Sequence, residues 1–258
     1  MLDRIIQLLS VRPRSRICCF HFGRCGSTLL GNMLGNHPHL EWAGELFHAH
    51  HVRTDRSNEL DPYHLLQNRI KTSQFRSFGF ETKFQHLDFN GLNIELTSFL
   101  ESLLSLGFNK FVLLKRQNYL RQAISVRKGQ ISGIWHADPS AAIRNSSPVF
   151  LDPTCISLGG TNRNILDCFQ FLDESYANAK RIFEALRIEY IEIVYEHHLE
   201  KHPSEGFDLA IEFFEMKPAA SRISTKKLES RPIKEIVLNY DDILDCLKDS
   251  KYEWMCHR

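Results

Sequence analysis

The sequence predicts an α/β fold in which a central parallel sheet is flanked by helices. Short apolar runs that are typical of buried strands alternate with longer segments whose apolar residues recur at helical spacing. The 258 residues, 43% of them hydrophobic, are enough for one α/β core with loop insertions. No internal repeat or low-complexity linker divides the chain. We therefore expect a single domain over residues 1–258.

Four segments are the strand candidates. The first and third are nearly continuous apolar runs, as expected for strands that are buried on both faces of a parallel sheet. The predicted strands cover residues 16–22, 77–84, 110–116 and 190–196. The predicted helices cover residues 27–36, 94–106, 118–132, 164–186, 207–216 and 241–250. Two further segments are expected to be loops, a polar and histidine-rich one at 48–76 and a proline- and glycine-rich one at 137–162.

Charge and cysteine content narrow the class of protein. The chain has 32 Lys and Arg against 31 Asp and Glu, a balance that disfavours a nucleic-acid binder. No run of 18 or more apolar residues is present and the N-terminal segment lacks the apolar core of a signal peptide, so we expect no membrane association. The seven cysteines form no CxxC pair, so we expect reduced, mostly buried thiols in a cytoplasmic protein.

A glycine-bearing turn stands between the first predicted strand and the first predicted helix. It reads Gly23-Arg24-Cys25-Gly26-Ser27-Thr28. In such a turn the N–H groups and the dipole of the helix attract a phosphate, Gly26 allows close approach of the backbone, and Arg24 adds a cationic donor. The turn matches neither GxxxxGK[ST], the P-loop of ATP- and GTP-binding proteins, nor the dinucleotide pattern GxGxxG. It therefore predicts a phosphate site, with a plain strand–helix connection as the structural alternative.

The stretch FGRCGSTLL, followed by NHPHLEWAGELF, resembles the 5′-phosphosulfate-binding loop of sulfotransferases. These enzymes use 3′-phosphoadenosine-5′-phosphosulfate (PAPS) as donor and release 3′-phosphoadenosine-5′-phosphate (PAP). The sequence is most similar to the bacterial small-molecule branch, which includes trehalose and nodulation-type sulfotransferases. The resemblance implies a P-loop-like sulfotransferase fold with loop insertions and a reaction without a metal. It also implies that the 5′-phosphosulfate is held by Arg24, Cys25, Gly26, Ser27 and Thr28.

A donor with two separated anionic ends requires a second phosphate site. Arg116 ends the third predicted strand, and Ser125 lies nine residues further on, where its hydroxyl can face back toward the strand end. The family has an Arg after a strand and a Ser within the next helix at its 3′-phosphate site, so the resemblance assigns Arg116 and Ser125 to that phosphate. Without the first motif, the basic residues Lys115, Arg116 and Arg121 would indicate only the solvated start of a helix.

Two weaker matches concern the same donor. IVYEHHL resembles a strand end of the family where an aromatic lies near the adenine, which makes Tyr195 a candidate; a core tyrosine is the alternative. STKKLESRP resembles a C-terminal segment whose basic residue ahead of a proline faces the 3′-phosphate. Lys227 is the best match there, with Lys226 and Arg231 behind it.

The general base is predicted from position and resemblance. Glu45 follows the first helix, where the chain can return to the sheet's carboxyl edge, and in the trehalose-type branch a glutamate from this region acts as base. Glu41, four residues earlier, is one alternative base. His136 is the other, since a neutral imidazole suits proton removal near pH 7. Arg24 is also expected to act in catalysis, by stabilising charge on the leaving group.

The acceptor site is expected at two segments of the chain. The predicted contacts are Phe47, His48, Trp135 and His136, together with the loops at 48–76 and 137–162. The histidines at 48, 50 and 51 do not have the spacing of a metal site, so no metal is predicted.

The sequence thus predicts a PAPS-dependent sulfotransferase that acts on a hydroxyl, amine or guanidine nitrogen of a small molecule such as a sugar or secondary metabolite. An ATP-dependent small-molecule kinase and a catalytically inactive nucleotide-binding protein of the same fold are the alternatives. The identity of the acceptor and the oligomeric state are not determined by the sequence.

Overall fold

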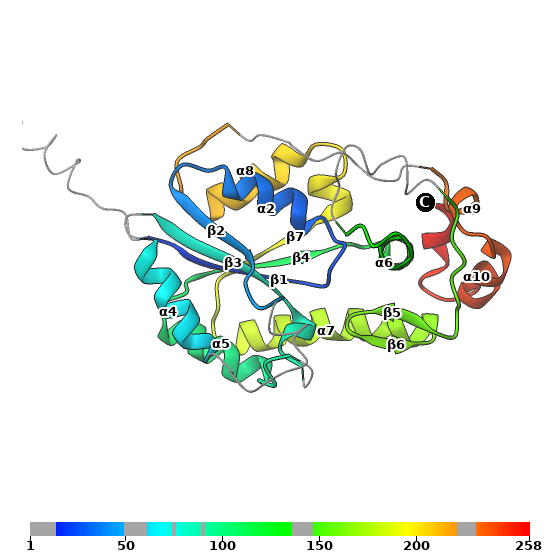
Figure 1. Ribbon diagram of the computed structural model, residues 1–258, viewed down its shortest axis with the longest axis horizontal. Helices are drawn as coiled ribbons and strands as arrows, with labels where there is room; N and C mark the ends of the chain where they lie inside the picture. Colours follow the sequence, from blue (N-terminus) through cyan, green and yellow to red (C-terminus); the bar gives the residue numbers. More distant parts are fainter. Residues whose placement is uncertain (1–13, 49–60, 74–75, 89–90, 136–146, 221–230) are drawn as a thin grey trace, which may run out of the picture.

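The computed structural model describes residues 14–48, 61–73, 76–88, 91–135, 147–220 and 231–258. The strands of its main sheet are β1 (Arg16–His21), β2 (Leu40–Glu45), β3 (Ser77–Lys83), β4 (Lys110–Lys115) and β7 (Tyr190–Val194). These strands are all parallel and lie in the order β2-β3-β1-β4-β7 (Figure 1). The predicted α/β class with a central parallel sheet is confirmed.

Helices cover both faces of this sheet. Their bounds are α2 (Ser27–Gly35), α4 (Pro62–Thr72), α5 (Leu96–Ser105), α7 (Ile165–Ala185) and α8 (Pro203–Phe213). Figure 1 shows α2 and α8 over one face and α4, α5 and α7 over the other. The predicted flanking of the sheet by helices is therefore also confirmed.

The other named elements lie at and beyond the carboxyl edge of the sheet. They are α6 (Tyr119–Ser132), α9 (Ile233–Ile236), α10 (Tyr240–Leu247) and an antiparallel hairpin of β5 (Ile156–Leu158) and β6 (Thr161–Arg163). Short helical turns are η1 (Phe84–His86), η2 (Tyr195–Leu199) and η3 (Glu253–His257).

The central strand β1 is buried on both faces. Cys18 and Phe20 belong to the hydrophobic cluster shared with α5 and α7, whereas Ile17 and Cys19 belong to the cluster shared with α2 and α8. Successive side chains of a strand point to opposite faces, so both sets have to be apolar. This two-sided burial explains the continuous apolar run that made the strand recognisable in the sequence.

Strand β2 was not predicted from the sequence. Its residues LEWAGE include a glycine and two glutamates and do not alternate cleanly between apolar and polar. The strand is held by pairing with β3, and the register shifts between Trp42 and Glu45. Its existence therefore depends on a partner strand that is distant in the sequence.

Two other elements fall in segments that were expected to be loops, and both carried a signal. Helix α4 starts with Pro62 in its first turn, and the Asp61 side chain accepts a hydrogen bond from the Tyr63 N–H at 2.9 Å. Both features mark helix starts. The β5–β6 hairpin turns at Gly159 and Gly160, which both have positive φ, and a Gly-Gly pair is a known two-residue hairpin signal.

The carboxyl ends of β1 and β4 lie next to each other at the centre of the sheet. The chain leaves β1 into α2 on one face, and after β4 it passes through α6 toward α7 on the other face (Figure 1). Where neighbouring connections diverge in this way, an open α/β sheet has a crevice in which ligands bind. The turn at 23–28 and Arg116 both lie beside this crevice.

Two further observations concern the cysteines and the apolarity of the helices. All seven cysteines are free thiols, and the buried ones are Cys18, Cys19, Cys25, Cys168 and Cys256. Among the described residues, no helix is both long enough and apolar enough to cross a bilayer.

Candidate active site

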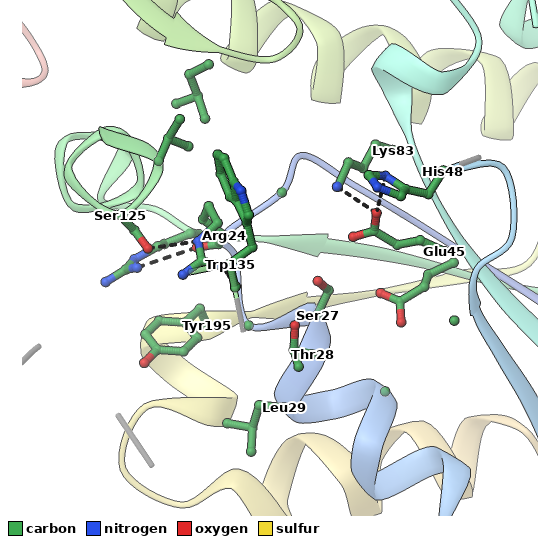
Figure 2. A pocket seen from close by; sticks show the side chains of 18 of the residues that line it. Arg24, Ser27, Thr28, Leu29, Glu45, His48, Lys83, Ser125, Trp135 and Tyr195 are labelled. Carbon is green, nitrogen blue, oxygen red and sulfur yellow. Dashed lines mark hydrogen bonds and ion pairs between the residues drawn. The ribbon is translucent and has the colours of Figure 1, made fainter. Parts of the chain in front are cut away.

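A pocket of about 1540 Å³ opens at the crevice between β1 and β4. Its walls come from the turn after β1, the ends of β2 and β3, helix α6, the turn η2 and the β5–β6 hairpin. The residues predicted from the sequence that line it are Arg24, Gly26, Ser27, Thr28, Glu45, His48, Arg116, Ser125, Trp135 and Tyr195. The fold therefore brings together side chains from five separate segments (Figure 2).

The turn after β1 has two residues in the left-handed region of φ, and one of them is a glycine. Arg24 and Gly26 have φ values of 68° and 93°. Gly26 is the N-cap of α2 and has no side chain to cap the helix, so the first N–H groups of α2 are available to an anion. A Cβ atom on Gly26 would lie 2.7 Å from Cδ2 of Tyr195, so the tyrosine ring would have to shift to make room for it.

Cys25 differs from its neighbours in this turn. Its side chain is fully buried in the cluster that β1 forms with α2 and α8, and it does not line the pocket. The thiol of Cys25 therefore points into the core, and contact of this residue with a phosphosulfate, through its backbone N–H, stays a prediction.

Arg24 connects the turn to helix α6. Its Nε donates a hydrogen bond to Oγ of Ser125 at 2.9 Å, and its Nη1 donates to the carbonyl of Trp135 (Figure 2). Burial lowers the pKa of Arg24, and the charge of Arg116 adds to this effect. Two guanidinium groups that face one pocket form a site suited to an anion of more than one negative charge.

Arg116 is held in place by two neighbours. Its guanidinium carbon lies 4.7 Å from the centre of the Tyr195 ring, and its Nε lies 3.6 Å from Oε1 of Glu196. The Glu196 carboxylate also accepts hydrogen bonds from the N–H groups of Gln117 and Asn118, at 2.8 and 3.0 Å. Glu196 thereby ties η2 to the connection between β4 and α6 and holds the Arg116 guanidinium in place.

Glu45 ends β2 and points into the pocket beside Lys83, the last residue of β3 (Figure 2). The distance from Lys83 Nζ to Glu45 Oε2 is 2.6 Å. His48 Nδ1 and His86 Nε2 lie 3.6 and 4.0 Å from the same oxygen. Burial raises the pKa of Glu45, but the Lys83 ammonium and its hydrogen bond, with smaller contributions from His21 and His48, lower it below its usual value. The carboxylate is thus ionised at neutral pH.

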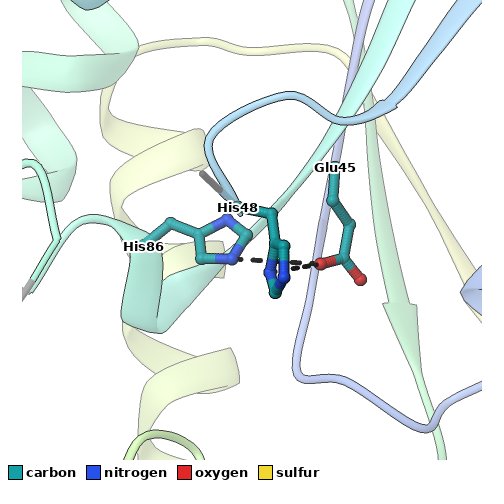
Figure 3. A group of neighbouring side chains, drawn as sticks. All are labelled: Glu45, His48 and His86. Atoms are coloured by element: carbon teal, nitrogen blue, oxygen red, sulfur yellow. Dashed lines mark ion pairs between the residues drawn. The ribbon is translucent and has the colours of Figure 1, made fainter. Parts of the chain in front are cut away.

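Glu45, His48 and His86 also have the composition of a metal site, because their ligand atoms lie within 4.8 Å of one another (Figure 3). The hydrogen bond to His86 does not suit a metal at that residue. The backbone N–H of Lys83 donates to His86 Nδ1 at 3.2 Å, which assigns the proton of the neutral ring to Nε2, the atom that faces Glu45. A metal-bound histidine has its lone pair on the facing nitrogen and donates its other N–H to an acceptor.

A buried ion pair lies on the same sheet below the turn. His21, the last residue of β1, has its Nε2 3.1 Å from Oε2 of Glu81, and the indole N–H of Trp42 donates to Oε1 of Glu81 at 3.2 Å. Burial by itself lowers the pKa of His21, but Cys25 and Glu81 together raise it to about 10. His21 is therefore an imidazolium at neutral pH.

Phe47 is a correction to the sequence prediction. It is 0% exposed and its ring packs against Phe80 and Phe99, with centroid distances of 5.6 and 5.9 Å. It contributes to the core between the sheet and α5, and it has no surface to offer to an acceptor. The chain turns inward directly after Glu45, so neighbours in the sequence face opposite sides.

The placement of Phe47 predicts a change in stability. Phe47→Ala is expected to lower the free energy of unfolding by about 3–5 kcal/mol, because it leaves a cavity in a closely packed layer. Urea denaturation followed by circular dichroism measures this change. His48→Ala, at a side chain that is 60% exposed, is the control and is expected to change stability by less than about 0.5 kcal/mol. Equal stabilities of the two variants would contradict the core assignment.

The remaining predicted site residues fall into two groups, those that the structure describes and those that it does not. His136 and Lys227 lie outside the described residues. Glu41, the other carboxylate considered as base, lies 3.7 Å from Arg76 and is not part of the pocket wall. Trp135 lines the pocket and is 43% exposed, which suits contact with a ligand.

The structure also adds residues that sequence reasoning missed. The pocket wall includes Lys83, Gln85 and His86, which follow one another at the end of β3 and in η1. The signal for them was present, since ligand-binding residues of parallel sheets gather at the carboxyl ends of strands and β3 was predicted from the sequence.

No family model matches the sequence, and no curated protein matches it. Among solved structures, a crystal structure of a sulfotransferase from Alicyclobacillus acidocaldarius matches with a TM-score of 0.54, covering 95% of this chain and 97% of that chain. The chain has a sulfotransferase fold. The two sequences are 12% identical, so the likeness concerns the fold, and the chemistry has to be inferred from the pocket.

Proposed function

We propose that this protein is a PAPS-dependent sulfotransferase that transfers a sulfuryl group to a hydroxyl, or to an amine or guanidine nitrogen, of a small molecule such as a sugar or secondary metabolite. One observation carries the proposal. The glycine turn after β1 and Arg116 after β4 line one pocket, and the hydrogen bond from Arg24 to Ser125 joins the turn to α6. PAPS has a phosphosulfate and a separate 3′-phosphate, and so fits a pocket with two anion sites.

Each end of the donor has its own set of partners in this proposal. The N–H groups at the start of α2, with the hydroxyls of Ser27 and Thr28, hold the 5′-phosphosulfate. Arg116 and Ser125 hold the 3′-phosphate, since a guanidinium binds phosphate oxygens in a bidentate manner. Tyr195 lies against Gly26 and stacks on Arg116, so it lines the wall between the two sites and would contact the adenosine.

The reaction is a single in-line displacement. A lone pair of the acceptor oxygen or nitrogen forms a bond to sulfur while the bond from sulfur to the 5′-phosphate oxygen breaks, and that electron pair leaves with PAP. Glu45 accepts the proton that the acceptor loses. Arg24 and the N–H groups of residues 25–28 stabilise the charge that develops on PAP. The step needs no metal, because little negative charge accumulates on the transferring group.

The acceptor side of the pocket is polar. Glu45, His48 and Lys83 lie together there, and Gln85 and the turn of the β5–β6 hairpin also line the pocket. Exposed Trp135 adds an aromatic surface. Polar groups with one aromatic face suit an acceptor that carries several hydroxyl groups.

Calorimetric titration with PAP and with ATP, each with and without Mg²⁺, tests the donor. We expect PAP to bind with a dissociation constant of about 1 μM or lower without Mg²⁺, and ATP to bind at least about tenfold more weakly. Preference for ATP with Mg²⁺ would support the kinase alternative. Release of PAP from PAPS in the presence of a panel of sugars, phenols and amines then separates an enzyme from an inactive nucleotide-binding protein.

The conformation of the turn leads to a separate prediction. Gly26→Ala is expected to weaken PAP binding by at least about tenfold, because a left-handed φ costs about 1–2 kcal/mol for alanine and the new methyl group also displaces Tyr195. Gly133→Ala is the matched control: φ is 70° there, and a Cβ would meet no atom within 4 Å. Calorimetry on both variants measures the effect, and equal affinities for PAP would contradict it.

A further inference from the structure

Lys83 lies between the candidate base and the phosphate-binding turn. Its Nζ is 2.6 Å from Oε2 of Glu45. Its Cε would be 3.1 Å, and its Nζ 3.7 Å, from a Cβ atom built on Gly23, the first residue of the turn. One flexible side chain therefore touches both parts of the site.

The pair of Lys83 and Glu45 conflicts with the role of Glu45 as a base. An ammonium in contact with a carboxylate stabilises the ionised form and makes it a weaker proton acceptor. It also occupies Oε2, the oxygen toward which His48 and His86 point. With Lys83 in this position, Glu45 is thus held in the form that takes up a proton least readily.

The other charged groups around Glu45 are less able to change partners. His86 on η1 and His21 on β1 are completely buried, and Arg24 on the turn is held by Ser125 and Trp135. His48, which follows β2, is exposed and lies further away than Lys83. Lys83 has a long stem, and 17% of its side chain is exposed.

We propose that Lys83 is a positioning residue that changes partners when the donor binds. In the free protein its ammonium holds Glu45, and bound PAPS draws it to the sulfuryl oxygens beside the turn, which releases Glu45 to accept the acceptor's proton. The proposal rests on the proposed function of this pocket. It couples the base to the donor, so that Glu45 becomes a competent base only when a sulfuryl group is in place.

Carbon-13 NMR of protein labelled at the glutamate carboxyl tests this exchange without an acceptor. The Glu45 signal is assigned as the one lost in Glu45→Gln, and its titration is followed in the free protein, with PAP and with PAPS. The measurement is made on wild type, Lys83→Met and Lys83→Arg, and on Lys128→Met as a control that removes a cation of the pocket wall on α6. Calorimetry on the same samples establishes whether the donor binds.

In wild type, the pH midpoint of the Glu45 titration is expected to rise when PAPS binds. In Lys83→Met, this midpoint is expected to be raised already in the free protein. The further rise on adding PAPS is expected to be smaller in Lys83→Met than in wild type, since only the direct effect of the donor's charge remains. Lys83→Arg is expected to behave as wild type, and Lys128→Met to leave the free midpoint unchanged.

Two results would overturn the exchange of partners while PAPS binding stays intact. One is an equal rise of the Glu45 midpoint in wild type and Lys83→Met when PAPS is added. The other is no rise of the midpoint in either protein. Absence of PAP and PAPS binding would overturn the proposed function, and the exchange with it. The calorimetric result therefore tells the two failures apart.

Discussion

Replacing Glu45 by glutamine is expected to lower the rate of sulfuryl transfer by about 10²–10⁴-fold, the range in which a general base contributes. Glutamine has almost the same shape but cannot accept the acceptor's proton. Binding of PAP is expected to stay within about twofold of wild type, because the carboxylate lies at the end of β2 and outside the two anion sites. PAP release with a reactive acceptor measures the rate, and calorimetry measures the affinity.

The pH profile of the wild type gives an independent readout of the same group. Burial raises the pKa of Glu45, but Lys83 lowers it below the usual value for a glutamate. The base is active when it is ionised, which is the case above its pKa. The rate at limiting PAPS, which reports the pKa of the free protein, is therefore expected to stay constant near neutral pH and to fall as the pH drops through that pKa.

Glu41→Gln is the matched control for the base assignment. Glu41 is on the same strand, but it pairs with Arg76 and lies outside the pocket wall. It is expected to keep wild-type transfer. Full activity in Glu45→Gln would instead indicate another base, and His136 would then be the residue to replace.

Replacing Arg116 by alanine is expected to weaken PAP binding by about 10²–10³-fold. The change removes a bidentate guanidinium, whose hydrogen bonds to a charged group are worth about 1.5–3 kcal/mol each, and each 1.4 kcal/mol corresponds to about tenfold in affinity. Arg116 is partly buried and lies between Tyr195 and Glu196, so its geometry is set before the ligand arrives. Calorimetric titration measures the loss.

Adenosine 5′-phosphate separates the role of Arg116 from a general loss of structure. It lacks the 3′-phosphate, so its affinity is expected to differ by less than about threefold between wild type and Arg116→Ala. Arg127→Ala provides the control on the protein side, since Arg127 is on α6 but is not part of the pocket wall. An equal loss of both nucleotides in Arg116→Ala would contradict a site for the 3′-phosphate.

The main elements of the sheet could be predicted from the sequence because their signals are local. The apolar runs at β1 and β4 report burial on both faces of a parallel sheet, and the glycine turn at 23–28 lies within one continuous stretch. Strand β2 has no such pattern and depends on pairing with β3. The Asp61-Pro62 helix start and the Gly159-Gly160 hairpin were local signals that the prediction did not use.

The sequence by itself predicted a phosphate site at the turn 23–28 and at the basic residue after β4, because each of these patterns lies within one continuous stretch of the chain at a strand end. Only the tertiary structure decided which side chains meet. Arg24 reaches Ser125 across 101 residues, and Lys83 reaches Glu45 across 38. The order β2-β3-β1-β4-β7 sets both contacts, and it turns Phe47 into the core while Glu45 faces the pocket. Strand order arises from hydrogen bonds and burial between distant segments, which no local pattern of residues records.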